Sequence, residues 1–484
     1  MLRWRFCKSL SALAYLSGFS SMSAATDGFD RYFQRLCADL WSTAFSFSGK
    51  LSGAFMPIDF KHSLPSRARN TALDSIGQHP PAVEQTGRDA LDRLEVLGSV
   101  SPQTRTQASR FLKIAKRGLP RMHRGGAFGH TLRAVKTDLH WTEHLEGDSL
   151  RYTAIAALGL FQVDRTTQQQ ILGGNTVLDL ANACVVRATT SADMGAVALA
   201  AWAAAEAGRF HSMPLFRQLV QILASDTSIA TVDCAWALSA GLAARQFGDT
   251  RDVVSLATKR LMSGRSSSGL FPHMLPASAS GRFRAHIGCF ADQVYPIQAF
   301  SRLHAAQPNI EALSAAEACA ERICALQGPA GQWWWHYDTR NGGVVEGYPV
   351  YSVHQHAMAP MALLELREAG GTDHSQAIIK GMRWLDEHPE VSTPLVAAEK
   401  GVIWRKVGRR EPRKIVRAIS AVTTALMPGL HVPGLDRLFP PICVDYECRP
   451  YELGWLMYAW LSGGVVAQLS LSPAGEMPAV SKEI

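Results

Sequence analysis

Three features are missing from this 484-residue sequence, and each absence narrows the class of protein. No apolar run reaches the roughly 18 residues that a membrane-spanning helix needs, so we expect no membrane span. No basic helix interleaved with aromatic residues and no nucleic-acid-binding motif is present, which argues against a nucleic-acid partner. Charged residues make up only 19% and apolar residues 47% of the chain, a balance typical of a globular protein with a sizeable core.

The cysteines form no recognisable disulfide framework. The chain has nine, an odd number, and most lie in helical patterns, as Cys184, Cys234, Cys289 and Cys319 do. This distribution predicts small buried thiols and a reducing, cytoplasmic location. The first 25 residues have a basic start, a mild apolar stretch and a small-residue end, so they resemble a weak secretory signal. Export through this segment is therefore the alternative location.

The chain changes character near residue 100. Residues 1–95 lack sustained periodicity and contain Ser/Gly clusters, which predicts an N-terminal extension. From there to residue 470, alanine and leucine dominate and favour helix. We therefore expect one helical domain over 96–470 and a short tail over 471–484.

Two kinds of helix alternate in this domain. Six amphipathic helices are expected at 106–118, 172–187, 212–224, 250–263, 308–326 and 375–387. Between them lie segments that are apolar all round after a polar first turn, a pattern typical of helices buried on every side. These segments begin at Arg151, Asp193, Asp233, Asp292, His354 and Glu452.

Six repeats of this alternation predict a closed ring. Six apolar helices inside and six amphipathic helices outside describe an all-α (α/α)6 toroid. The long connections, 264–289, 327–350 and 388–450, all run from an outer to an inner helix. They therefore meet at one face, the N-terminal ends of the inner helices, which we call the mouth. Long loops held by a rigid scaffold are the usual place for function.

An unusual aromatic stretch precedes the fifth inner helix. Residues 331–350 read GQWWWHYDTRNGGVVEGYPV, with an Asn-Gly pair between two alternating runs. This pattern predicts a β-hairpin at the mouth. Flat aromatic side chains suit the C–H face of a sugar, a prenyl chain or a carbocation. The other interpretation is that the tryptophans only seal the loop against the barrel.

Residues 327–333 resemble a known repeat. Gln327, Gly331 and Trp333 fit the Q-x-x-x-G-x-W pattern of terpenoid cyclases and their prenyltransferase relatives. The twelve-helix layout also resembles the six-hairpin glycosidases, polysaccharide lyases and epimerases, and bacterial proteins encoded with surface-polysaccharide genes. Both groups share the α/α toroid, and the resemblance implies a cavity where the loops meet the inner helices. It does not decide the reaction, because one fold hosts many chemistries.

The sequence departs from the cyclase and prenyltransferase patterns. The Asp-x-Asp-Asp cluster of squalene-hopene-type cyclases is absent, and only one good repeat motif is present. Prenyltransferases hold zinc with Asp, Cys and His. Asp445, Cys448 and His354 could supply that set, but their spacing does not require it. We therefore expect no metal and no cofactor.

The candidate site residues all fall at the expected mouth. Those able to transfer protons are Asp292, His336, Asp338, Glu346 and His354, because sugar chemistry relies on positioned acid and base groups. N-capping is the alternative role for the acidic residues that begin inner helices. Expected substrate-binding residues are Trp333, Trp334, Trp335, Tyr348, Tyr351, Gln293, Arg151, Arg405, Arg409, Glu447, Arg449, Tyr451 and Glu452.

These observations favour a carbohydrate-active enzyme or accessory protein that acts on a bacterial poly- or oligosaccharide. The net charge of +8 and the basic run at 405–410 suit an anionic one. Hydrolysis, β-elimination and epimerisation remain open. A terpenoid or prenyl-diphosphate enzyme is the second hypothesis and predicts a dry, aromatic-lined cavity. A non-catalytic scaffold is the third, and it predicts that the charged ring pairs off internally and leaves no deep pocket. The oligomeric state is not predicted.

Overall fold

The computed structural model describes residues 92–136 and 141–471, which belong to one compact unit, Glu84–Ile484. The expected N-terminal extension and C-terminal tail lie almost wholly outside these residues. The seven cysteines in the described part are free thiols, and Cys184, Cys234 and Cys319 are buried as expected. None of the described helices is both long and apolar enough to cross a bilayer.

The six outer helices are amphipathic, and each buries one stripe. In α9, for example, Leu215, Phe216, Leu219 and Leu223 are buried at helical spacing while the rest face outward. Side chains set several starts, such as the capping box that Thr176 and Asp179 form at α7. The outer set is α4 (Pro102–Gly118), α7 (Val177–Ala188), α9 (Met213–Ala224), α11 (Arg251–Gly264), α13 (Ile310–Ala325) and α15 (Ser375–Glu387). Each matches a predicted helix closely.

The six inner helices are buried on all sides. Every residue of α8, from Met194 to Glu206, is buried, and six alanines after its first turn let neighbouring helices approach closely. The inner set is α5 (Leu150–Leu160), α8 (Met194–Glu206), α10 (Thr231–Ala244), α12 (Ala291–Ala306), α14 (Ala359–Glu368) and α18 (Pro450–Leu461). A π-helical turn, η3 (His354–Met358), leads into α14, so this inner helix also begins where the sequence predicts.

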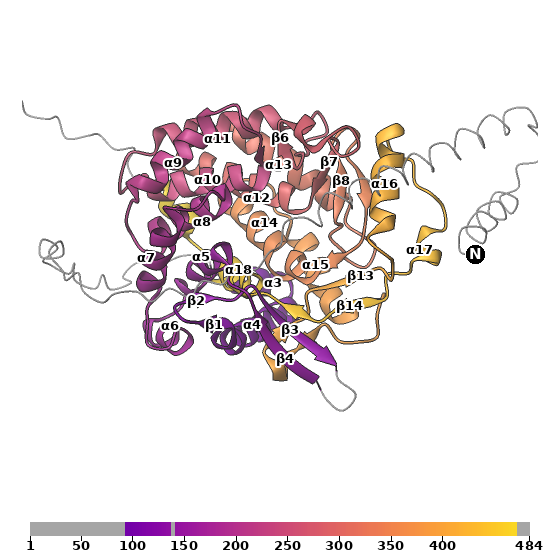
Figure 1. The fold of residues 1–484 in the computed structure, drawn as a ribbon, viewed down its shortest axis with the longest axis horizontal. Coiled ribbons are helices and arrows are strands. Elements are labelled where there is room, and N and C mark those ends of the chain that lie inside the picture. The colour runs from indigo at the N-terminus through magenta and orange to yellow at the C-terminus, as the bar shows by residue number, and fades with distance from the viewer. Residues whose placement is uncertain (1–91, 137–140, 472–484) are drawn as a thin grey trace, which may run out of the picture. The chain divides into compact units, whose positions relative to one another are not determined.

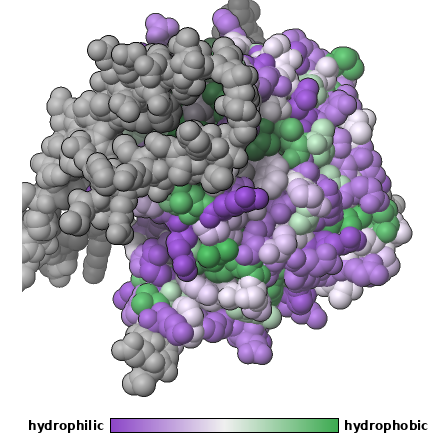
Figure 2. Space-filling view, turned by 90° about the vertical axis from the view of Figure 1, so that its right-hand side faces the viewer, coloured by the Kyte–Doolittle hydropathy of each residue, from purple (hydrophilic) through white to green (hydrophobic). Residues whose placement is uncertain are grey.

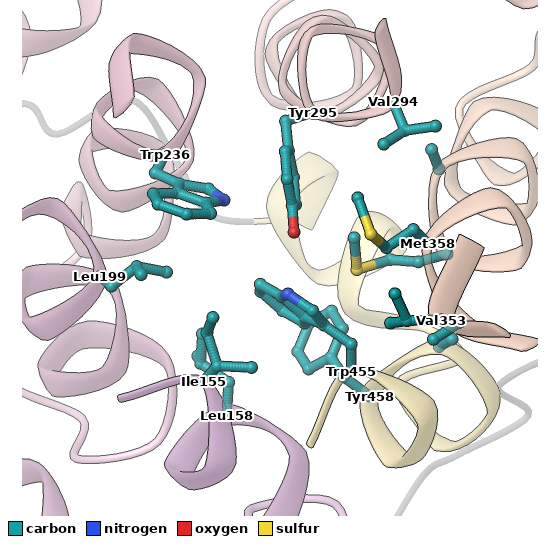
Figure 3. Packing of buried hydrophobic residues seen from close by; sticks show 14 of the residues in the cluster. Ile155, Leu158, Leu199, Trp236, Val294, Tyr295, Val353, Met358, Trp455 and Tyr458 are labelled. Atoms are coloured by element: carbon teal, nitrogen blue, oxygen red, sulfur yellow. The ribbon is translucent and has the colours of Figure 1, made fainter. Parts of the chain in front are cut away.

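The inner helices close into a ring. Each packs against the next in the order α5, α8, α10, α12, α14 and α18, and α18 packs back on α5. The outer helices cover this ring from outside, as Figure 1 shows. Along the axis, Trp236, Tyr295 and Trp455 point toward one another, with Met358 nearby (Figure 3). The predicted (α/α)6 toroid is confirmed, and its centre is filled by aromatic and aliphatic side chains.

Two glycines allow the ring to close. A Cβ atom on Gly159 of α5 would lie 2.2 Å from the Gly454 carbonyl oxygen of α18. We therefore expect Gly159→Ala to lower the free energy of unfolding by about 1–3 kcal/mol, the usual cost of overpacking a core. Urea denaturation measures this. Gly408→Ala is the matched control, because its nearest neighbour would lie 3.9 Å away. Equal stability of the two variants would contradict this account of ring closure.

Small antiparallel sheets occupy the mouth. They are built from the connections that run from outer to inner helices, and of their strands the sequence predicted only the hairpin of β8 and β9. The three-stranded sheets are β7–β8–β9 (Ile287–Cys289, His336–Asp338, Gly343–Glu346), β10–β13–β14 (Val350–Tyr351, Lys406–Gly408, Cys443–Asp445) and β15–β3–β4 (Glu447–Cys448, Thr131–Lys136, Trp141–Glu146). The two-stranded sheets are β1–β2 (His123–Arg124, Ala127–Phe128), β5–β6 (Ile229–Ala230, Met274–Leu275) and β11–β12 (Val396–Ala397, Val402–Ile403).

Shorter helices complete the described chain: α3 (Arg93–Val100), α6 (Arg165–Ile171), α16 (Ile415–Leu426), α17 (Leu435–Leu438) and α19 (Val465–Leu471).

The longest connection, 388–449, wraps one side of the mouth and carries α16 and α17. Helix α16 packs on strand β9, where Ala421 meets Ile287 and Val345 in a small apolar cluster. Thr424 shares a hydrogen bond of 2.9 Å with His286, which ties the helix to the same sheet. The side of the molecule that carries these helices mixes apolar and polar patches (Figure 2). This connection therefore brings α16 against the predicted hairpin.

Candidate active site

Part of the predicted charged ring pairs off internally. Arg151 of α5 donates to Asp193 at 2.7 Å and to Asp233 at 2.8 Å. Asp193 also caps α8, accepting from the Gly195 backbone N–H at 3.0 Å, so the capping interpretation holds for it. Burial raises the pKa of Asp233 although Arg151 opposes the shift. This ion cluster joins three inner helices at the mouth, and each of its charged groups has a partner within the chain.

Asp292 has different surroundings. It lies in the first turn of α12, is fully buried, and accepts a 2.7 Å hydrogen bond from the Cys289 backbone N–H. Its other partner is the imidazole Nδ1 of His273, at 3.1 and 3.3 Å from the two carboxylate oxygens. The Asp292 carboxylate raises the pKa of His273, whose side chain is 54% exposed. A buried carboxylate that orients a solvent-accessible histidine is a chemically competent acid/base pair.

The same place is the candidate for a metal. The ligand atoms of His273, Cys289 and Asp292 all lie within 4.8 Å of one another, and these residue types can bind zinc. The guanidinium group of Arg284 acts electrostatically on His273 and Cys289. Because this positive charge would repel a dication, the surroundings favour zinc less than the ligand types alone suggest.

The predicted hairpin forms, and a third strand pairs with it. Strands β8 and β9 pair antiparallel around Asn341 and Gly342, and β7 adds to β8 so that Cys289 lies opposite His336. Gly342 has φ +70°, which the turn requires and glycine adopts without strain. Because β7 ends just before α12, the hairpin is fixed next to Asp292.

The three tryptophans have different roles. Trp333 is fully buried against Phe290 with a ring separation of 5.5 Å, so it seals the loop to the barrel and is not placed to bind a sugar. Trp334 is half-buried and packs against Tyr348. Trp335 is also half-buried, and its backbone carbonyl accepts from the Phe290 N–H at 3.0 Å. Of the three, Trp335 is the one whose backbone is joined to Phe290, two residues before Asp292.

An aromatic wall extends from Trp335 across the mouth. The His354 ring stacks on Trp335 at 5.9 Å, and the Tyr351 ring lies 4.7 Å from Trp335. Burial lowers the pKa of His354 to about 3, so its imidazole is neutral at ordinary pH. In the described structure its Nδ1 atom is buried without a hydrogen-bond partner. This wall offers flat apolar surface and one neutral polar ring.

The other predicted acid/base residues of the hairpin are engaged elsewhere. Asp338 accepts from the Arg340 side chain at 2.7 and 3.0 Å, and Glu346 accepts from Arg409 at 2.9 Å. His336 is buried, and burial lowers its pKa well below the usual value. The two carboxylates are therefore structural ion pairs in this arrangement, whereas His336 stays a neutral group beside Cys289.

A second cluster faces the mouth from α18. Glu452, which is buried, lies 3.4 Å from Arg405, and Arg405 lies 3.6 Å from Glu447. Arg405 also stands over the Tyr351 ring at 4.9 Å, which joins this cluster to the aromatic wall. Burial raises the pKa of Glu452 to about 7. A carboxyl with this pKa holds a proton it can donate near neutral pH.

The remaining predicted binding residues lie around these groups. Arg449 donates to the Tyr152 hydroxyl at 3.0 Å and to Glu447 at 3.0 Å, and the Tyr451 ring lies 4.6 Å from that of Tyr152. Gln293 is buried and bonds both backbone groups of Phe271 at 2.9 Å, so it holds a loop. The Tyr348 hydroxyl donates to Glu390 at 2.9 Å.

Glu452 predicts a pH dependence of stability. Its folded pKa of about 7 lies above the ordinary 4.5, so the group's contribution to the free energy of unfolding is complete below pH 4.5. That contribution is lost as pH rises through 7. Glu452→Gln should remove the loss and be about 1–3 kcal/mol more stable than the parent at pH 8, but not at pH 4.5. Denaturation at pH 4.5, 6, 7 and 8 measures this, with exposed Glu387→Gln as the control. A parallel pH profile for parent and variant would contradict it.

Several site residues were not foreseen as such. His273 lies in the connection 264–289, which the sequence placed at the mouth, but nothing in the sequence linked it to Asp292, 19 positions later. Arg284 and Arg417 gave no sequence signal. The predicted anion-binding arginines are instead paired with carboxylates of the chain: Arg405 with Glu447 and Glu452, and Arg409 with Glu346.

No protein-family model and no curated protein sequence matches this chain. Similar solved structures exist, all with low identity. An unsaturated glucuronyl hydrolase specific for heparin is 10% identical, with a TM-score of 0.44 over 76% of this chain and 98% of that one. An unsaturated glucuronyl hydrolase from Bacillus sp. GL1, described as responsible for glycosaminoglycan degradation, is 13% identical, with a TM-score of 0.43 over 75% and 97%.

An α-1,6-mannanase from Salegentibacter sp. HEL1_6 is 11% identical, with a TM-score of 0.35 over 75% of this chain and 99% of that chain. These TM-scores are too low to establish the fold by comparison. The toroid is established instead by the contacts between the inner helices of this chain, which close a ring of six. The chemistry of this chain has to be inferred from its mouth.

Proposed function

We propose that this chain is a carbohydrate-active enzyme that transfers protons to or from a poly- or oligosaccharide bound at the toroid mouth. One observation carries the proposal: the carboxylate of Asp292, which is fully buried, is hydrogen-bonded to a histidine that solvent can reach. A buried carboxylate is costly unless something compensates it. Here the compensation is a group that can exchange protons with a ligand.

The aromatic wall supports a sugar as that ligand. Trp335 and Tyr351 are half-buried or buried rings 4.7 Å apart, and they lie between the Asp292 pair and Glu452. A pyranose presents an apolar C–H face that packs on such rings. Hydroxyl groups at its edge would then reach the polar groups on either side.

The proposed roles follow from the two clusters. Asp292 orients His273 and favours its protonated form, so this pair can hold or accept a proton. Glu452, with its pKa near 7, is the second proton donor or acceptor. Hydrolysis, β-elimination and epimerisation all need two such groups on a sugar. The named neighbours, two glucuronyl hydrolases and a mannanase, act on carbohydrates, which agrees with this class.

The alternatives fit the mouth less well. A scaffold would pair all its mouth charges internally, as the Arg151 cluster does, but the Asp292 pair and two arginines are left available. A terpenoid enzyme would need a clustered acidic motif, and the sequence has no Asp-x-Asp-Asp. The terpenoid hypothesis also predicts a dry, aromatic-lined cavity, but in this toroid aromatic and aliphatic side chains fill the centre (Figure 3).

The test is a panel of oligosaccharides incubated with the purified chain. The panel holds neutral glycans, uronate-containing glycans and unsaturated lyase products, with prenyl diphosphates as the competing class. Products are separated by mass, by absorbance of new double bonds and by deuterium uptake from solvent, which report hydrolysis, elimination and epimerisation respectively. Turnover of a glycan supports the proposal, and turnover of a prenyl diphosphate alone would overturn it.

A further inference from the structure

Two arginines at the mouth differ from those that the sequence predicted to bind substrate. Arg151, Arg405, Arg409 and Arg449 each lie against a carboxylate of the chain. Across the described residues, neither Arg284 nor Arg417 has an acidic partner within ion-pair distance. Arg284 acts electrostatically on His273, and Arg417 stands over the Trp335 ring. These two positive charges at the mouth are thus uncompensated.

The fold brings these two guanidinium groups together. Arg284 is exposed in the loop before β7, and Arg417 lies on α16, which packs on the same sheet. Burial lowers the pKa of Arg284, and the positive charge of Arg417 lowers it further. Like charges that are kept close and partly desolvated cost free energy unless an anion joins them.

The surroundings of Arg417 are shaped for a ligand. Its guanidinium stands 5.5 Å above the Trp335 ring, and its Nε atom is buried without a hydrogen-bond partner. His336 is only 3% exposed, and its Nδ1 atom has no hydrogen-bond partner. Burial lowers the pKa of this imidazole, and the positive charges of Arg417 and Arg284 lower it further. Unsatisfied buried polar atoms are rare in folded proteins, so a cluster of them beside free cations marks a binding site.

We propose that Arg284 and Arg417 form a subsite for an oxyanion carried by the sugar. The bound ring would pack on Trp335, with its acidic group between the two guanidinium groups and its reacting carbon toward Asp292 and His273. Arginine suits this role because its planar fork binds carboxylate, sulfate or phosphate oxygens in pairs. The inference rests on the proposed function and names its substrate class: an acidic sugar.

The test compares dissociation constants for matched ligands by calorimetry. The ligands are one neutral oligosaccharide and its uronate, sulfated and phosphorylated counterparts, together with free sulfate and phosphate. Proteins are the parent, Arg284→Gln, Arg417→Gln, the double variant and Arg417→Lys. Arg437→Gln, an exposed arginine of α17, is the control for net charge. Circular dichroism confirms that each variant is folded.

We expect the parent to bind one acidic form at least about tenfold more tightly than the neutral one, which corresponds to about 1.4 kcal/mol. The double variant should lose this preference and keep its affinity for the neutral sugar. Arg437→Gln should behave like the parent, and Arg417→Lys should fall between parent and Arg417→Gln. The preferred ligand identifies the oxyanion.

Two results would overturn the inference alone: equal affinity of the parent for neutral and acidic sugars, or an unchanged preference in the double variant. Binding of the free ions without any preference among the sugars would also overturn it. Failure of every sugar to bind would instead overturn the proposed function. The two failures are therefore distinguishable.

Discussion

Asp292→Asn should reduce turnover by about 10²–10⁴-fold, the usual contribution of a positioned acid or base. Asparagine keeps the shape and can still accept from the Cys289 N–H, so the affinity for oligosaccharide should change much less than kcat. The neutral amide no longer raises the pKa of His273, which should return toward its ordinary value. The limb of the pH–rate profile that reports His273 should therefore move to lower pH. Steady-state kinetics across pH measures both effects.

Two further variants sharpen this prediction. His273→Gln should lower kcat and remove that limb from the profile, because the group that titrates is gone. Asp249→Asn is the matched control: this carboxylate is exposed and paired with Arg251 in the link between α10 and α11, at the opposite end of the ring. If Asp292→Asn kept kcat within a factor of a few of Asp249→Asn, the acid/base role of Asp292 would be wrong.

Glu365→Ala should destabilise the toroid by about 3–5 kcal/mol, the cost of leaving a buried charge without its partner. Arg302 is fully buried and donates to Glu365 at 2.6 and 3.0 Å. Its third contact is Glu206 at 3.1 Å, and its guanidinium stands 4.8 Å above Trp202. The cluster joins α8, α12 and α14, well away from the helix starts at the mouth. Loss of Glu365 would leave Arg302 with one carboxylate inside the core.

Denaturation in urea gives the free energies for a double-mutant cycle. Arg302→Met with Glu365→Leu should recover much of the loss, since well-packed apolar residues often replace a buried ion pair at little cost. Exposed Glu387→Ala should stay within about 0.5 kcal/mol of the parent. A loss of less than 1 kcal/mol in Glu365→Ala would show that solvent reaches this cluster and that its burial is overstated here.

The repeating architecture could be predicted from the sequence because it depends on local patterns. One apolar stripe marked each outer helix, and all-round apolarity marked each inner one, so 213–224 and 375–387 were placed almost to the residue. The hairpin followed from its Asn-Gly turn. The β3–β4 hairpin was missed, since a polar strand with alternating burial at the edge of a small sheet has little apolar signal.

The site was harder to predict because it depends on which side chains meet. Arg405 and Arg409 form a basic run in the sequence, yet their charges are balanced by Glu452 and Glu346, which lie 47 and 63 positions away. Trp333 and Trp335 differ by two positions, so strand alternation predicts the same face for both. Trp333 is fully buried and Trp335 only half-buried, because β8 begins only at His336 and strand alternation does not apply before it. Arg417 reaches the mouth only because its helix, α16, packs on strand β9 of the sheet β7–β8–β9, which comes from an earlier part of the chain.

The measurement that tests the central claim most directly is a crystal structure of Asp292→Asn with an acidic oligosaccharide. The account predicts a sugar ring packed on Trp335, its acidic group between Arg284 and Arg417, and its reacting carbon beside position 292 and His273. Density for the sugar on another face of the toroid, with the mouth unchanged, would contradict it.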